Sequence, residues 1–170
     1  MEDSDVVERQ IGRRPRAFNR VVARCPFGAP AVTEQRPYDA AGAPFPTTYY
    51  LTCRHLVAGV SRLEAGGGVE RWSEAVAASA ELTADLTAAT DLQRRVRHDL
   101  AAGSTGIDGG ASLDSGIGGS RNPGQLKCLH AHVAFALAQP GYAIGERVMA
   151  EIPDPFPADR CCADSEGTAA

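Results

Sequence analysis

Three cysteines lie far apart in this chain of 170 residues, each within a distinctive local sequence. Cys25 begins a Cys-Pro-Phe-Gly segment, Cys53 ends a Tyr-Tyr-Leu-Thr-Cys segment, and Cys128 lies in a Lys-Cys-Leu-His-Ala-His segment. Thiolates and imidazoles are the side chains that bind soft or borderline metal ions and carry nucleophilic chemistry. If the fold brings the three thiols together, they can form a functional site.

The segment after Pro123 predicts a helix in which Cys128 and His132 share one face, one turn apart. This i, i+4 spacing can chelate a metal ion, and it can also place the imidazole beside the thiol as a base or ion-pair partner. His130 falls on the opposite, apolar side, where a histidine is more often a hydrogen-bonded core residue than a ligand. Cys128 is therefore the expected anchor of any chemistry here.

A zinc site made from three cysteines and one histidine would have tetrahedral coordination. Four protein ligands leave no open position for water, so such a zinc would be structural. An iron–sulfur cluster fits less well because the clustered cysteine spacing typical of these proteins is missing. Each isolated cysteine also has a competing interpretation as a packed core thiol. The expected metal ligands are Cys25, Cys53, Cys128 and His132, with His130 in reserve.

The same residues support an enzyme alternative, in which Cys128 is a nucleophile and His132 or His130 is its base. The arginine-rich segment 9–24 or a glycine-rich loop would then hold an anion, and the substrate would be a phosphorylated small molecule. A nucleophilic thiol must be free to react with alkylating agents, whereas a metal ligand is protected from them. Metal analysis therefore separates the two hypotheses.

Composition limits the classes of partner. The formal net charge of −4 argues against a general nucleic-acid binder. No apolar stretch is long enough to span a bilayer, and the acidic start of the chain is unlike a secretory signal. We therefore expect a cytoplasmic protein, with reduced cysteines. A third hypothesis is an interaction module for a protein partner, whose mark would be a contiguous exposed apolar patch.

The predicted elements bring strand ends and helices together. Residues 18–24 and 31–36 are expected to form a hairpin with Cys25 at its tip, and residues 47–53 an edge strand. Apolar residues at helical spacing predict the helices. They cover about residues 4–11, 56–63, 69–76, 81–100, the segment after Pro123, and 144–152.

These elements predict a single α+β domain over residues 5–152, with a small antiparallel sheet of about three strands packed on four or so helices. Residues 103–124 are rich in glycine and polar residues, so we expect a flexible loop there. Residues 153–170 are expected to form a disordered acidic tail. Cys161 and Cys162 lie in this tail and are interpreted as incidental.

Five segments form an ordered series of motifs. They are Gln10-Ile-Gly-Arg with Pro15-Arg16, Arg24-Cys25-Pro26, Gly42-Ala-Pro-Phe-Pro-Thr running into Tyr49-Tyr-Leu-Thr, Arg62-Leu63-Glu64, and Lys127-Cys128-Leu129-His130. In order and spacing the series resembles a bacterial family, domain of unknown function 501, over roughly residues 8–150. The family has no established activity. Its genes often lie near those of a septum-formation protein and an exopolyphosphatase, so the resemblance implies envelope or phosphate biology and a division-associated protein partner.

The chain departs from the family pattern at three places. Phe135 stands where relatives carry a histidine, with His132 one turn earlier. Ala143-Ile-Gly-Glu replaces the usual Asn-Pro-x-Gly-Asp stretch. Relatives also carry a histidine where this chain has Cys53, and a cysteine-to-histidine exchange suits a metal ligand.

Overall fold

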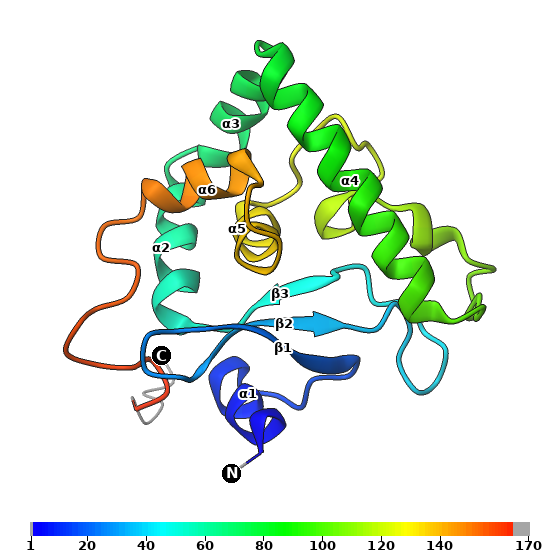
Figure 1. Ribbon diagram of the computed structural model, residues 1–170, viewed down its shortest axis with the longest axis horizontal. Helices are drawn as coiled ribbons and strands as arrows, with labels where there is room; N and C mark the ends of the chain where they lie inside the picture. The colour runs from blue at the N-terminus through cyan, green and yellow to red at the C-terminus, as the bar shows by residue number, and fades with distance from the viewer. Residues whose placement is uncertain (1, 165–170) are drawn as a thin grey trace.

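The structure is a computed structural model that describes residues 2–164 (Figure 1). It confirms the predicted α+β class, with a three-stranded antiparallel sheet and six α-helices in the described part of the chain. The strands are β1 (Phe18–Arg24), β2 (Pro30–Gln35) and β3 (Tyr49–Leu51). The helices are α1 (Asp3–Ile11), α2 (Arg54–Ala65), α3 (Gly68–Ala77), α4 (Ala80–Ala101), α5 (Leu129–Ala138) and α6 (Ala143–Ala150).

The sheet has the order β1-β2-β3, so β2 is the central strand. All six residues of β2 are buried, in keeping with a strand that is paired on both edges and covered on both faces. Val32 of β2 pairs with Ala23 of β1 and with Leu51 of β3. The edge position predicted for the third strand is confirmed. Because the pairing is antiparallel, the end of β1, the start of β2 and the end of β3 meet at one end of the sheet.

Helix α5 lies at the centre of the helical layer, against the sheet and between α2, α4 and α6 (Figure 1). Seven of its ten residues are buried, among them Val133 and Phe135. A helix that is apolar on every side must be enclosed by other elements, and this explains its central place. Helix α1 lies on the other side of the sheet (Figure 1). Only the two ends of α5 approach the surface, since His130 near its start and Leu137 and Ala138 at its end are partly exposed.

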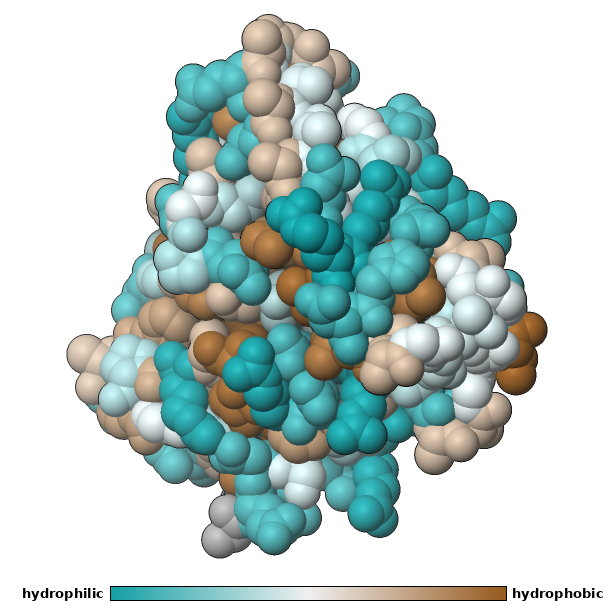
Figure 2. Space-filling model, turned by 45° about the vertical axis from the view of Figure 1, so that its right-hand side comes forward, coloured by the Kyte–Doolittle hydropathy of each residue, from teal (hydrophilic) through white to brown (hydrophobic). Residues whose placement is uncertain are grey.

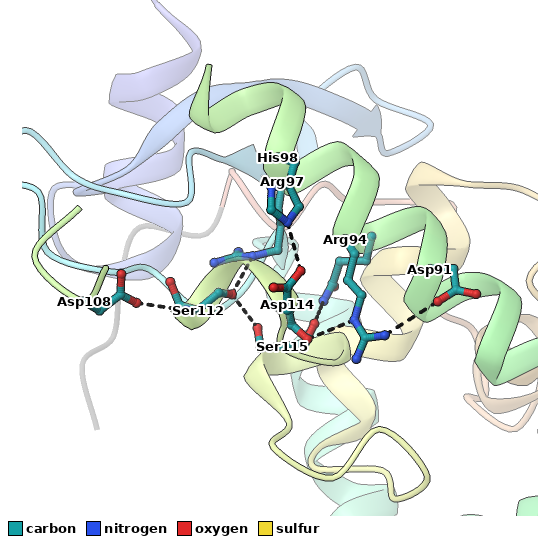
Figure 3. Close-up of polar contacts among 9 residues, drawn as sticks. Asp91, Arg94, Arg97, His98, Asp108, Ser112, Asp114 and Ser115 are labelled. Atoms are coloured by element: carbon teal, nitrogen blue, oxygen red, sulfur yellow. Dashed lines mark hydrogen bonds and ion pairs between the residues drawn. The ribbon is translucent and has the colours of Figure 1, made fainter. Parts of the chain in front are cut away.

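The glycine-rich segment 103–124 differs from the expected flexible loop, because it is folded against α4. Arg94 Nε donates a hydrogen bond to the Asp114 carbonyl, and Arg97 Nε donates to the Ser112 carbonyl (Figure 3). These arginine side chains satisfy backbone acceptors that a glycine-rich segment cannot pair within itself. The segment contains two short 3₁₀ helices, η1 (Ala111–Asp114) and η2 (Ile117–Gly119).

The chain after α6 also differs from the prediction of a disordered tail, as far as residue 164. It runs past α2 toward the end of the sheet, and Ile152, Cys161 and Cys162 are buried in the main core (Figure 1). Apolar side chains that reach a core gain enough free energy to order a short irregular segment. Residues 165–170 lie outside the described part of the chain.

Candidate functional site

Cys25 and Cys53 lie at the same end of the sheet, as the predicted site requires. Each faces a cysteine of the C-terminal segment. The Sγ atoms of Cys25 and Cys161 are 3.7 Å apart, and the thiols of Cys53 and Cys162 are near enough for each to shift the pKa of the other. All four thiols are buried. We call Cys25, Cys53, Cys161 and Cys162 the thiol cluster.

Hydrogen-bond donors surround one sulfur of this cluster. Gln10 Nε2 lies 3.5 Å from Cys162 Sγ, and the main-chain amide of Arg54, the first residue of α2, also donates to that sulfur. The neighbouring Cys53 thiol is the largest of several influences that lower the pKa of Cys162. Burial raises the pKa of Cys161 to about 11. The cluster therefore contains one sulfur that burial keeps protonated and one that faces hydrogen-bond donors.

The predicted metal ligands do not converge on one point. Across residues 2–164 no three or more His, Cys, Asp or Glu side chains are arranged to hold a metal ion. Cys25 and Cys53 face the C-terminal cysteines, whereas Cys128 and His132 have other neighbours. Zinc binding, and the weaker iron–sulfur alternative, stay predictions.

Cys128 is not part of the helix that was expected to carry it. Its backbone is extended, with φ −154° and ψ 148°, and α5 begins at Leu129. The i, i+4 relation with His132 is therefore absent. The Cys128 sulfur lies near Gly118 of η2, where an added Cβ atom would be 3.6 Å from it. Burial raises the pKa of Cys128, which keeps it a thiol.

His132 is a core residue, with 1 % of its surface exposed. Its Nδ1 atom lies 2.7 Å from the Tyr142 hydroxyl, and the two rings stack. Its Nε2 atom is buried and has no hydrogen-bond partner among residues 2–164. Burial lowers the pKa of His132 to about 3, so the imidazole is neutral at physiological pH.

His130, expected on the apolar side of its helix, instead lies at the surface between two side chains of α2. Its Nε2 atom is 3.3 Å from Ser61 Oγ, and its Nδ1 atom is 3.1 Å from Glu64 Oε1. The side chains of His130 and Glu64 are about a quarter exposed, 27 % and 25 %, and Ser61 is exposed. A serine, a histidine and a carboxylate thus form a hydrogen-bonded row that solvent can reach.

The partners of His130 determine its tautomer. An ionised carboxylate can only accept hydrogen bonds, so Nδ1 of the imidazole must carry the proton that points to Glu64. In the neutral ring Nε2 is then the acceptor, and the Ser61 hydroxyl donates to it. This arrangement leaves the basic nitrogen facing the serine.

Glu64 and Ser61 are three residues apart on α2 and therefore share a face of that helix. This spacing could have indicated from the sequence that Ser61 and Glu64 lie side by side. No local sequence pattern, however, links them to His130, which lies 66 positions after Glu64. The thiol cluster was missed for a related reason: two of its members lie in the segment expected to be disordered.

Positive charge lies next to the start of α5. Lys127 precedes Cys128, and with Arg121 it lines a surface pocket of about 290 Å³. The other lining residues are Gly119, Ser120, Gln125 and Leu126, which supply hydroxyl and amide groups. Such a pocket suits an anionic group.

The contiguous exposed apolar patch that we expect of an interaction module is not prominent. Among the described residues, the large apolar side chains that are exposed are Phe27 and Ile107, in different parts of the chain. The face shown in Figure 2 is largely hydrophilic, with its apolar residues in separate small groups. No helix within residues 2–164 is both long and apolar enough to cross a membrane. A protein partner stays a prediction.

Comparison with known proteins supports the resemblance seen in the sequence. A family profile described as "Protein of unknown function (DUF501)" matches residues 21–150. Neither a curated protein nor a solved structure matches the chain. The matched residues include Ser61, Glu64 and His130, whereas Cys161 and Cys162 lie beyond them.

Proposed function

The chain belongs to the DUF501 family of proteins of unknown function, and we propose that it is a hydrolase with Ser61, His130 and Glu64 as its catalytic triad. The observation that carries this proposal is the pair of hydrogen bonds that joins the three side chains in a row, at 3.3 Å and 3.1 Å. A nucleophile, a base and a group that orients the base are the parts that acyl transfer needs.

The chemistry follows from the tautomer of His130. As the Ser61 oxygen attacks the carbonyl carbon of an ester, its proton passes to His130 Nε2. Glu64 holds the ring in place and stabilises the imidazolium that forms. The proton then passes from His130 to the leaving alkoxide, and water hydrolyses the acyl-serine by the same route in reverse.

The surroundings favour an anionic substrate. Lys127 and Arg121 line the pocket just before α5, so a phosphate or carboxylate group could be bound there. We therefore propose an ester of a phosphorylated small molecule as the substrate class. Cys128 has no role as nucleophile in this proposal, because burial raises the pKa of its thiol.

A fluorophosphonate probe tests the nucleophile without knowledge of the substrate. Its phosphorus is attacked by an activated serine, and fluoride leaves. We expect stoichiometric labelling of Ser61 in the full-length protein, together with hydrolysis of p-nitrophenyl acetate. Labelling should be lost in Ser61→Ala and reduced at least tenfold in His130→Gln, because general-base catalysis is commonly worth about 10²-fold or more.

The matched control is His98→Gln. His98 Nε2 lies 2.9 Å from Asp114 Oδ1, so it is also a surface histidine paired with a carboxylate. Its labelling should equal that of the wild type. If the probe does not label Ser61 in a folded protein, or labels it equally in His130→Gln, the proposal is wrong.

A further inference from the structure

Another pocket, distinct from the one beside Lys127, lies between α3, α4 and the chain that leads into α5. Its volume is about 400 Å³, which is within the range of small-molecule sites. Apolar groups form part of its lining: Val76 of α3, Leu86 of α4, and Pro123 of the loop before α5. The residues of the proposed hydrolase lie elsewhere, on α2 and α5. An apolar portion of a ligand is therefore the part that these walls would contact.

Thr90 presents an unpaired hydroxyl group at this pocket. The residue lines the pocket and is only 3 % exposed, and its Oγ1 atom is buried with no hydrogen-bond partner among residues 2–164. The other two threonines of the lining are paired. Thr83 Oγ1 donates to the Val76 carbonyl at 2.8 Å, and Thr87 Oγ1 donates to the Thr83 carbonyl at 2.9 Å. Because a buried hydroxyl without a partner costs free energy, the exception at Thr90 points to a ligand.

Two opposite charges lie side by side in the lining of the same pocket. Arg94 Nη1 is 3.6 Å from Asp91 Oδ1 (Figure 3), which is longer than a hydrogen bond, so both groups can still bind other partners. A hydrogen bond from Arg94 Nε to the Asp114 carbonyl holds the guanidinium in place. The Asp91 side chain is 53 % exposed and that of Arg94 35 %. A ligand with adjacent cationic and anionic groups is complementary to this pair.

We propose that this pocket binds a free α-amino acid with an apolar side chain. Its carboxylate pairs with Arg94, its ammonium group pairs with Asp91, and its side chain contacts the apolar walls. Thr90 precedes Arg94 by one helical turn and so shares its face of α4, where the unpaired hydroxyl can donate to the same carboxylate. In a peptide the chain separates the two charged ends, whereas a free amino acid carries both charges next to one carbon atom.

The experiment titrates L-leucine and L-phenylalanine into the full-length protein. Isothermal titration calorimetry measures the affinity, and amide NMR locates the site. We expect saturable shifts confined to residues 83–94 and 123–124. Two analogues of leucine test the two charges: 3-methylbutylamine lacks the carboxylate, and 4-methylpentanoate lacks the ammonium group. Each should bind at least about tenfold more weakly than leucine, because each loses one hydrogen-bonded charge.

Two variants test the residues that would recognise the ligand. Thr90→Val removes the hydroxyl and keeps the shape of the side chain, so it should weaken leucine binding about threefold or more. Its free energy of unfolding should not fall, because the hydroxyl that it removes is unpaired. Asp91→Asn should abolish the preference for leucine over 4-methylpentanoate. The matched control is Asp99→Asn, another exposed acidic residue of α4, which should bind leucine like the wild type.

Three outcomes would overturn the proposal. The first is the absence of saturable shifts with both amino acids up to their solubility limits. The second is binding of 4-methylpentanoate as tightly as leucine, which would show that the ammonium group is not recognised. The third is equal leucine affinity in Asp91→Asn and Asp99→Asn. Labelling of Ser61 by the fluorophosphonate probe is a separate measurement, so either proposal can fail without the other.

Discussion

The Glu64 carboxylate accepts a hydrogen bond from the Leu129 main-chain amide at 2.6 Å, and so links α2 to the first residue of α5. The residue before α5, Cys128, supplies no side-chain cap for the helix. The carboxylate of a distant residue thus takes the place of a local N-cap, where negative charge is also favoured by the helix dipole. One oxygen therefore stabilises the helix and orients His130.

Replacing Glu64 should separate these two roles. Glu64→Ala leaves the Leu129 amide without its acceptor, and we expect it to lower the free energy of unfolding by about 1–2 kcal/mol. Glu64→Gln retains an acceptor and should lose less stability, yet both variants should label more weakly with the fluorophosphonate probe. Urea denaturation measures the stability. Glu74→Ala, at an exposed position of α3, is the control, and equal stability of Glu64→Ala and Glu74→Ala would contradict the capping role.

Most of the fold could be predicted from local patterns. The first strand was expected over residues 18–24 and is observed at Phe18–Arg24. The long helix expected over residues 81–100 is observed at Ala80–Ala101, where Ser79 accepts a hydrogen bond from the Leu82 amide as an N-cap. Alternation, helical spacing and capping are properties of neighbouring residues, so the sequence displays them directly.

The candidate site could be predicted only in part, because it depends on contacts between distant segments. Helical spacing around Cys128 was misleading, since the chain leaves the preceding loop in an extended conformation and α5 starts one residue later. The partnership of Glu64 with His130 spans 66 residues and has no local signature. Cys161 and Cys162 follow a proline-rich stretch, which led to the prediction of a disordered tail. The sequence therefore does not indicate that the chain returns to the core there.

Asp108 should make the folded glycine-rich segment sensitive to acid. Partial burial raises the pKa of its carboxylate, but hydrogen bonds from Ser112, Tyr38 and Gly110 outweigh this effect and hold the pKa at about 2. A depressed pKa contributes stability that is present above about pH 4 and is lost as the pH falls toward 2. Asp108→Asn should unfold with a weaker dependence on pH in this window, as followed by tryptophan fluorescence. Asp99→Asn is the comparison, and parallel pH curves for Asp108→Asn and the wild type would contradict the prediction.

Gly145 sets the close packing of α5 on α6. A Cβ atom at this position would lie 2.2 Å from the His132 carbonyl oxygen and 2.6 Å from the Ala136 side chain. Because the carbonyl belongs to the helical backbone, it cannot rotate away, and the helices would have to separate. Gly145→Ala should therefore destabilise the protein by about 1–3 kcal/mol, seen as a lower Tm in a thermal melt. Gly124→Ala, where the nearest atom would be 3.6 Å away, should melt like the wild type.

His132 should cause stability to fall between pH 6.5 and pH 3. Burial lowers its pKa from 6.5 to about 3, so in this window the unfolded chain binds a proton that the folded chain excludes. Stability then rises with pH, with a slope approaching about 1.4 kcal/mol per pH unit for one proton. His132→Gln removes the titrating group, and although it should be less stable at pH 7, its stability should change less between pH 6.5 and pH 4.5. Urea denaturation at each pH measures the slope, with the exposed His98→Gln as the control. If His132→Gln and wild type have the same slope, the neutral, buried state of this imidazole is not the cause of the acid sensitivity.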